Sequence, residues 1–283
     1  MKITEKHLFV NGKKVLVSLS SHTQKKTKCI FVFIHDLGEN SNKYVQWFQL
    51  FEEIGVATIS FDMPGHGSSE GKKDCFETTK EVFEIIDKML VMAEVGFNLV
   101  PVVLYGNGLG AAIAVEYYLT VRPKVIGLIL ASPLLELKQL QPKKQGFFTN
   151  LFQKNSIKVE TKTDNNQVDK SLTVTRYKEE LLQNKDIANS FSTISKMIEH
   201  VLSTANRIMI PTLLLYGEKA QKTEIDLTGQ LLKNIGKKAT LVALPNMFYE
   251  LHDSQPNRVS MEIIRWIKEF ILNANELQMA NNY

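Results

Sequence analysis

The sequence predicts an α/β fold with a mostly parallel, doubly wound sheet. Two observations lead to this class. Short runs rich in Val, Ile and Leu, flanked by turn residues, have the character of buried strands. These runs alternate along the chain with longer segments that have a helical pattern. Such alternation implies parallel strands joined by helical crossovers, and sheets of this kind carry their active groups at the carboxyl ends of the strands.

The predicted elements follow one another in a regular order. The chain begins with a hairpin, in which HLFV and KKVLVSLS flank an Asn11-Gly12 turn. Buried strands are predicted after the hairpin at residues 28–34, 56–61, 101–105, 125–131, 211–217 and 240–244. Helical patterns lie between or after them at residues 43–54, 77–95, 109–120, 223–235 and 259–272.

The composition indicates an ordinary globular protein. The 283 residues are 44% hydrophobic, enough to fill a sizeable core, and the net charge is only +4. The lysines are scattered among acidic residues, so nucleic-acid binding has no compositional support. Cys29 and Cys75 are too few for a disulfide framework or a cysteine-based metal site, which favours a reducing compartment. Because we see no signal core, transit peptide or membrane-spanning segment, we expect a cytoplasmic protein.

One segment breaks the alternation of strands and helices. Residues 136–207 contain no convincing core strand: their first part is polar and rich in lysine and asparagine, and their second part has a mostly helical pattern. We interpret this segment as a mainly helical cap inserted into a core formed by residues 1–135 and 208–275. Residues 276–283 are expected to form a polar C-terminal tail.

Four motifs carry a family resemblance. HDLGENSNKY resembles HGxGEHSxRY, FDMPGHGSSEG resembles DhxGHGxSxG, LYGNGLGAA resembles LGHSMGGA, and LILASPLLEL resembles a strand followed by a Ser-Pro turn. In this order they are typical of α/β-hydrolases of the monoacylglycerol lipase type, which are grouped with the serine aminopeptidase-like S33 hydrolases. The chain resembles this family over residues 29–270. The resemblance implies the α/β-hydrolase fold and, in active members, acyl transfer by a serine, a histidine, an acid and an oxyanion hole.

The resemblance places the catalytic nucleophile at Gly108, which has no side chain. Active members have a serine there, at a sharp turn between a strand and a helix. Glycine adopts the strained, positive-φ conformation of this turn without steric cost, so the turn can persist without its nucleophile. The alternative, that GNGLG is a phosphate-binding loop, is disfavoured because the motif lacks the lysine of such loops and the spacing of a dinucleotide fingerprint.

The other two catalytic positions also lack the required chemistry. Ala220 stands where the family has its aspartate; Glu218 and Glu224 are nearby, but we interpret them as a solvated loop charge and a helix-start charge. Tyr249 stands at the position of the catalytic histidine, and a tyrosine with a pKa near about 10 is a poor general base at neutral pH. His252, three residues on, is displaced too far to reach the elbow and is interpreted as structural.

The backbone donors of the oxyanion hole are expected to remain. The N–H groups of Leu37 and Leu109 match the two donors of the family. Asp36 replaces the family's glycine and brings a carboxylate beside a site for developing negative charge, which is electrostatically unfavourable for catalysis. Since Gly108, Ala220 and Tyr249 replace the nucleophile, its orienting acid and its base, the sequence predicts a pseudoenzyme.

Other reactive residues are assigned structural roles. Ser132 matches a family serine that is not the nucleophile, and it is expected in a turn. Cys75 lies near lysines, but no histidine partner is implied, so a surface or packing role is favoured. His35 and His66 match residues that brace the loops around the elbow and are expected to be buried hydrogen-bonding groups. The six histidines show no metal-ligand spacing, and neither a metal nor a cofactor is implied.

Two functional hypotheses remain. The first is a non-catalytic subunit that binds other proteins of a larger assembly, in the cytoplasm and, by analogy, on the cytoskeleton. Its candidate contact with a partner or a membrane surface is formed by Phe147, Phe148 and Phe152, which could instead pack the cap onto the core. The second is a protein that still uses the acyl pocket, as a residual acylglycerol lipase or esterase or as a lipid binder that does not hydrolyse its ligand.

Overall fold

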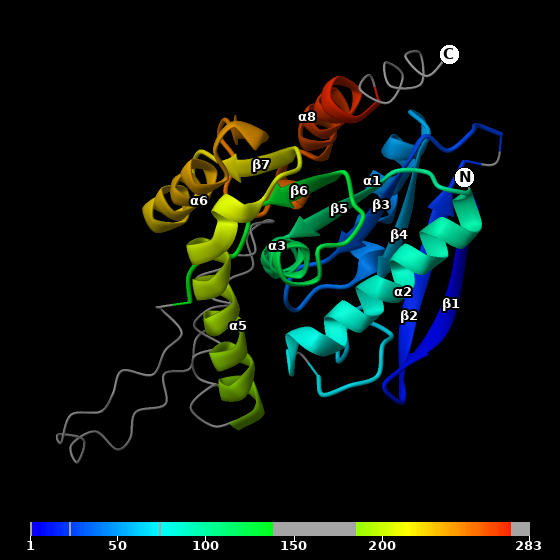
Figure 1. The fold of residues 1–283 in the computed structure, drawn as a ribbon, viewed down its shortest axis with the longest axis horizontal. Helices are drawn as coiled ribbons and strands as arrows, with labels where there is room; N and C mark the ends of the chain where they lie inside the picture. The colour runs from blue at the N-terminus through cyan, green and yellow to red at the C-terminus, as the bar shows by residue number, and fades with distance from the viewer. Residues whose placement is uncertain (1, 23, 74, 138–184, 273–283) are drawn as a thin grey trace, which may run out of the picture.

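A computed structural model describes residues 2–22, 24–73, 75–137 and 185–272, which form an eight-stranded sheet covered by helices on both faces (Figure 1). The strand order is β1-β2-β4-β3-β5-β6-β7-β8. The six strands β3 to β8 run parallel to one another. This arrangement confirms the predicted α/β class. The strands are β1 (Lys2–Val10), β2 (Lys13–Ser21), β3 (Cys29–Ile34), β4 (Val56–Phe61), β5 (Val102–Asn107), β6 (Gly127–Ala131), β7 (Thr212–Gly217) and β8 (Ala239–Leu244).

The predicted hairpin is present as β1 and β2. Asn11 and Gly12 both have positive φ, 49° and 78°, which is the geometry of the tight turn whose twist matches antiparallel strands. The register pairs Val10 with Lys13 next to the turn, and β2 then pairs antiparallel with β4 through Val17 and Phe61. The hairpin therefore extends the parallel sheet by two antiparallel strands.

Alternation along the strands divides the core into two layers. In β3, for example, Ile30 and Val32 face one apolar cluster, whereas Phe31 and Phe33 face the other. The first cluster lies under α2 (Thr79–Phe97), α3 (Leu109–Val121), α5 (Lys185–Thr204) and α6 (Lys222–Ile235). The second lies under η1 (Ser41–Tyr44), α1 (Val45–Glu52), α7 (Leu251–Ser254) and α8 (Pro256–Ile267), and η5 (Lys268–Leu272) continues α8. Two short turns, η3 (Ala205–Arg207) and η4 (Gly236–Lys238), lead into β7 and β8.

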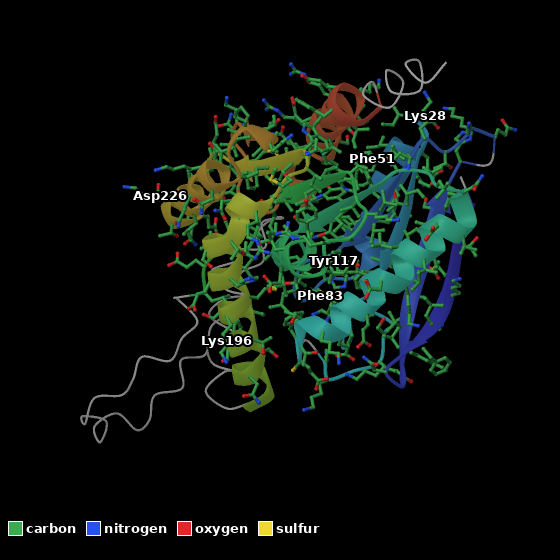
Figure 2. The ribbon with its side chains drawn as sticks, viewed as in Figure 1. Lys28, Phe51, Phe83, Tyr117, Lys196 and Asp226 are labelled. Carbon is green, nitrogen blue, oxygen red and sulfur yellow. The ribbon has the colours of Figure 1, made fainter. Side chains whose placement is uncertain are left out.

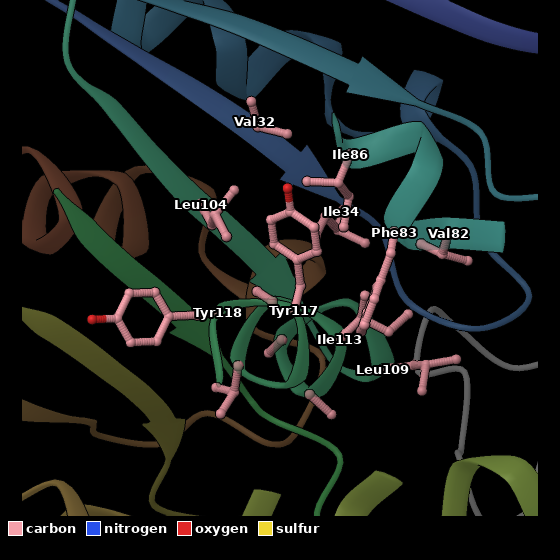
Figure 3. Close-up of a cluster of buried hydrophobic side chains, with 14 of the residues drawn as sticks. Val32, Ile34, Val82, Phe83, Ile86, Leu104, Leu109, Ile113, Tyr117 and Tyr118 are labelled. Atoms are coloured by element: carbon pink, nitrogen blue, oxygen red, sulfur yellow. The ribbon is translucent and has the colours of Figure 1, made fainter. Parts of the chain in front are cut away.

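Helix α3 is the central helix of the first layer. Its small residues allow close packing: a Cβ at Gly110 would lie 2.1 Å from the carbonyl oxygen of Ile34. Figure 3 shows Ile113 and Tyr117 of α3 facing Phe83 of α2. The rings of Phe83 and Tyr117 meet edge to face with centroids 5.2 Å apart. These contacts hold α3 closely against the end of β3 and against α2.

The predicted cap falls mostly outside the described residues. Its described part is α5, whose buried face includes Phe191, Ile194 and Val201 in the first apolar cluster. His200 of α5 lies 2.6 Å from the carboxylate of Glu116 on α3. The C-terminal tail, residues 276–283, also lies outside the described residues. Within the described part, no helix is long and apolar enough to span a membrane.

Candidate functional site

The turn between β5 and α3 has the geometry of a nucleophile elbow. Gly108 has φ 55° and ψ −116°, and its N–H donates to the carbonyl oxygen of Ala131 at the end of β6. The neighbouring glycines are needed for close approach, since a Cβ at Gly106 would lie 2.3 Å from the carbonyl oxygen of Gly110. The elbow is therefore retained, with a glycine at its centre.

The carboxylate of Asp36 fills the space that a nucleophile would need. A Cβ built on Gly108 would lie 2.0 Å from Cγ of Asp36 and 2.1 and 2.2 Å from its two carboxylate oxygens. These distances are far below van der Waals contact. Asp36 is only 4% exposed. The side chain of Asp36 therefore fits here only because residue 108 has no side chain.

The same carboxylate binds the two N–H groups that the family resemblance assigns to an oxyanion hole. Oδ1 of Asp36 accepts hydrogen bonds from the backbone N–H of Leu37 at 2.8 Å and from that of Leu109 at 2.7 Å. These are the distances at which an oxyanion hole holds its ligand. The positive end of the α3 dipole also favours an anion here. From the sequence we expected this charge beside the two donors; in the structure it accepts a hydrogen bond from each of them, which stabilises it.

Tyr249 contributes a hydroxyl donor at the predicted position of the base. Its hydroxyl lies 3.4 Å from Oδ2 of Asp36, and its carbonyl oxygen accepts a hydrogen bond of 2.7 Å from the hydroxyl of Ser132. Burial, and then the negative charge of Asp36, raise the pKa of Tyr249 well above its ordinary value. The phenol therefore stays protonated at neutral pH. Ser132, at φ 41°, fixes the loop that carries Tyr249.

His252 lies in an aromatic cage on the α1 side of the sheet. Its Nε2 and the hydroxyl of Tyr105 are hydrogen-bonded at 2.6 Å, and its ring lies 4.6 Å from that of Trp47 and 5.0 Å from that of Tyr44. Burial, and then the charge of Lys43, lower the pKa of His252 to about 3. The imidazole is therefore neutral and hydrogen-bonded to a strand residue.

The predicted position of the acid is part of a plain turn. The N–H of Ala220 donates to the carbonyl oxygen of Gly217 at 2.9 Å. Glu224 accepts a hydrogen bond from the N–H of Gln221 and so caps the start of α6, while Glu218 is exposed. Phe147, Phe148 and Phe152, the predicted contact with a partner or membrane, lie outside the described residues.

A charged network braces the loop that presents Asp36. Nζ of Lys43 binds Glu39 at 2.6 Å and Asp253 at 2.8 Å, and so joins this loop to α7, which carries His252. Glu39 also accepts a hydrogen bond from the hydroxyl of Tyr44, which in turn accepts one of 2.9 Å from the amide of Asn107 beside the elbow. Burial alone would lower the pKa of Lys43, but the charge of Glu39 and the contact with Asp253 outweigh it and raise this pKa.

Two further buried groups support the same loops. His35 binds the carbonyl oxygen of Asp36 through Nδ1 at 2.7 Å and accepts from the N–H of Met63 through Nε2 at 2.8 Å. Burial, and then the proximity of His66, lower the pKa of His35 to about 4. Nδ1 of His66 lies 3.0 Å from the carbonyl oxygen of Pro64. Cys75 is 5% exposed, so of the two roles that the sequence left open the packing role applies.

The comparisons with known proteins agree with this geometry. The sequence profile of the family described as serine aminopeptidase, S33, matches residues 25–255. The chain belongs to this family. A Schizosaccharomyces pombe relative named "Putative monoglyceride lipase" is 24% identical over 261 residues, which cover 84% of this chain and 67% of the relative.

Solved structures show the same fold. A monoacylglycerol lipase of Paleococcus ferrophilus has a TM-score of 0.64 at 22% identity, with 89% of this chain and 98% of that chain covered. A thermostable carboxyl esterase of Bacillus coagulans has a TM-score of 0.70 at 19% identity, with 96% and 99% covered. The eight-stranded sheet of this S33 family member is thus an α/β-hydrolase sheet.

The position of Asp36 is the feature of the site that sequence reasoning missed. The signal was present in two motifs, an acidic residue in HD where the S33 family has glycine and a glycine in GNGLG where it has serine. Read separately, they describe two losses. Taken together, the two differences from the family place the carboxylate of residue 36 in the space that a side chain at residue 108 would need.

The buried histidines predict loss of stability in acid. In the unfolded chain His252 takes up a proton as the pH falls below its ordinary pKa of 6.5, whereas in the native chain it resists protonation down to about pH 3. The stability that it contributes is therefore complete above pH 6.5 and decreases as the pH falls toward 3, by about 1.4 kcal/mol per pH unit. The pKa of His35 is also lowered, so the stability that His35 contributes is likewise lost as the pH falls.

This prediction can be checked with urea unfolding between pH 7 and pH 4. The variant His252→Phe keeps an aromatic ring in the cage but cannot be protonated, so we expect its stability to fall less steeply with acid than that of the wild type. Parallel pH profiles for the two proteins would show that His252 does not carry the effect.

Proposed function

We propose that this S33 family member is catalytically inactive and acts as a structural or protein-binding subunit. One observation carries the proposal: the carboxylate of Asp36 occupies both the space of the nucleophile and the oxyanion hole. The protein keeps the fold and the contacts that hold the loops around the elbow, but its own carboxylate fills the reaction centre. Such a protein is suited to binding partners through its surface.

The chemistry of ester cleavage supports inactivity. An acyl substrate must place its carbonyl oxygen against the N–H groups of Leu37 and Leu109, but both already donate to Asp36. This competitor is built into the chain and does not dissociate. The elbow offers no hydroxyl at Gly108, and the high pKa of Tyr249 prevents it from acting as a base at neutral pH.

The alternative is a residual acylglycerol lipase or esterase, or a lipid binder that does not hydrolyse its ligand. Membership of a hydrolase family and the names of the relatives favour it. For hydrolysis the carboxylate of Asp36 would have to leave the hole, and another group would have to attack. For lipid binding alone neither step is required, so the two activities need separate measurements.

Three measurements on the purified full chain separate these functions. We expect no saturable hydrolysis of a monoacylglycerol or of p-nitrophenyl butyrate above the buffer rate, and no fatty acid or monoglyceride retained in native mass spectrometry. From source cells, the chain is expected to sediment as part of a complex larger than its own 32.2 kDa. Saturable turnover would refute the inactive state, and sedimentation as a free monomer would refute the subunit role.

A further inference from the structure

The edge of the sheet opposite the elbow combines exposed aliphatic residues with a strong excess of positive charge. Each parallel strand begins at this edge, and hydrogen bonds connect neighbouring entry segments: Lys28 with Gly55, Ile30 with Pro101, and Leu128 with Pro211. In Figure 1 this is the side on which the arrows of β5, β6 and β7 start and α2 ends. We call it the amino-edge surface, formed by residues 22, 24–28, 53–55, 98–101, 121–126, 205–211 and 236–238.

Charge is distributed unevenly between this surface and the rest of the protein. Its segments contain eight basic residues and one acidic residue, so their net charge exceeds the +4 of the whole chain. The acidic residue, Glu53, already pairs with Lys25 at 2.6 Å. All eight basic residues are exposed. In Figure 2, Lys28 marks this edge, and Lys196 lies far from it, on α5. The surface is therefore complementary to an acidic partner.

Exposed aliphatic side chains lie at the middle of the same edge. Leu99 is 79% exposed where the chain enters β5, and Met209 is 66% exposed where it enters β7. Between them, Val121 ends α3 beside β6 and is 42% exposed. Because β5, β6 and β7 are adjacent in the sheet, these residues belong to chain segments that enter neighbouring strands.

Leu99 is held in a conformation that leucine disfavours. Its φ is 65°, and the preceding Asn98, which ends α2, has φ 48°. A branched side chain in this left-handed region is strained, and its high exposure means that core packing does not compensate the strain. Backbone strain of this kind concentrates at binding sites.

We propose that the amino-edge surface docks a protein whose contacting face is acidic and partly apolar. This deepens the proposed role as a protein-binding subunit, on which it rests. The aliphatic residues and the arginines Arg122 and Arg207 lie at the centre of the surface, while lysines of the segments entering β3 and β8 lie at its two ends. Protein interfaces have this arrangement, with Met and Arg enriched at the centre and lysine toward the rim.

Contacts of Arg122 connect two segments at the centre of the surface. Arg122 donates from Nη1 to the carbonyl oxygen of Arg207 at 2.9 Å and lies over the ring of Tyr118, 5.5 Å from its centroid. This contact joins the segments entering β6 and β7. An anionic membrane is the less suitable partner, because no Trp or Tyr is among the exposed large apolar residues of the described part, and these side chains typically anchor proteins at bilayer interfaces.

Site-specific photocrosslinking of the full chain in lysate of its source cells tests this proposal. A benzophenone amino acid replaces Met209 in one variant and Met261 in its control, since both methionines are 66% exposed and Met261 lies on α8. We expect the first variant to form a recurrent adduct whose crosslinked peptide, identified by mass spectrometry, is acidic and contains apolar residues. Equal adducts from both variants, no adduct at Met209, or a basic crosslinked peptide would overturn the proposal.

Charge and strain variants sharpen the test. Lys124→Glu is expected to reduce the adduct at least about five-fold, whereas Lys196→Glu leaves it unchanged. Leu99→Gly removes both the strain and the side chain, so we expect a melting temperature higher by a few degrees together with loss of the adduct. An unchanged adduct in Lys124→Glu or Leu99→Gly would contradict the role of this surface.

Vesicles of 70% phosphatidylcholine and 30% phosphatidylserine test the membrane alternative, and we expect no flotation of the chain with them. Flotation that is lost in Lys124→Glu would assign the surface to a membrane and overturn the proposal. None of these readouts involves hydrolysis. If these experiments contradict the docking surface, the proposal that the site is inactive is unaffected. Conversely, ester turnover would contradict the inactive site but would not test this surface.

Discussion

Replacing Gly108 by serine is expected to destabilise the protein by about 3 kcal/mol and to leave it without esterase activity. The new Cβ would lie 2.0 Å from Cγ of Asp36, so the carboxylate or the elbow must move. Overpacking of a buried site costs about 1–3 kcal/mol, and a side chain in the left-handed region adds about 1 kcal/mol. Restoring the nucleophile alone therefore fails for a steric reason, before any question of its base arises. Urea unfolding monitored by circular dichroism measures the loss.

A second glycine separates the clash from the backbone strain. Gly236 has φ 70° and ψ −139°, close to the 55° and −116° of Gly108, and no heavy atom lies within 4 Å of a Cβ built on it. Gly236→Ser therefore carries the strain without the clash. Asp36→Gly/Gly108→Ser removes the clash, so we expect it to be more stable than the sum of the single substitutions predicts. A cost for Gly108→Ser no larger than that for Gly236→Ser would contradict the packing described here.

Replacing Asp36 by alanine is expected to destabilise the protein by about 3 kcal/mol through a different mechanism. The N–H groups of Leu37 and Leu109 lose their common acceptor, and each unsatisfied buried donor costs about 1–3 kcal/mol. Asp36→Asn keeps an oxygen acceptor of the same size, so its loss is expected to be smaller. Thermal unfolding of both variants at pH 7 gives the comparison.

Formate supplies a chemical control for this prediction. In Asp36→Ala the two donors and the N-terminus of α3 become available to a small anion. We expect added sodium formate to raise the melting temperature of Asp36→Ala in a saturable way, while sodium chloride at the same ionic strength does not, and the wild type shows no difference between the salts. Equal responses of the two proteins would show that Asp36 does not fill the hole.

The fold could be predicted from the sequence because its signals are local. Asn11-Gly12 determines the hairpin, the apolar runs determine the strands, and the glycines around residue 108 mark the elbow. These patterns act over a few residues, where backbone geometry and periodicity decide the outcome. The family followed from the order of four such motifs, and the match over residues 25–255 confirms it.

The interior of the site could not be predicted in the same way. The contact between Asp36 and the N–H of Leu109 joins residues 73 positions apart, and its meaning depends on which direction one side chain takes in a tight space. Likewise, the hydrogen bond from Tyr105 and the ring contacts of Tyr44, Trp47 and Tyr105, which belong to three separate elements, hold His252 away from the elbow. Tertiary packing decides such positions, and a single sequence contains no local pattern for it.

Labelling with a fluorophosphonate probe, followed by intact-mass and peptide mass spectrometry, tests the central claim most directly, because this probe modifies an activated serine wherever one exists in the folded chain. The account predicts no adduct on the wild-type protein and none on Gly108→Ser, in which Tyr249 still supplies no base to activate the new hydroxyl. A stoichiometric adduct on any serine of the folded wild-type chain, absent after denaturation, would contradict it.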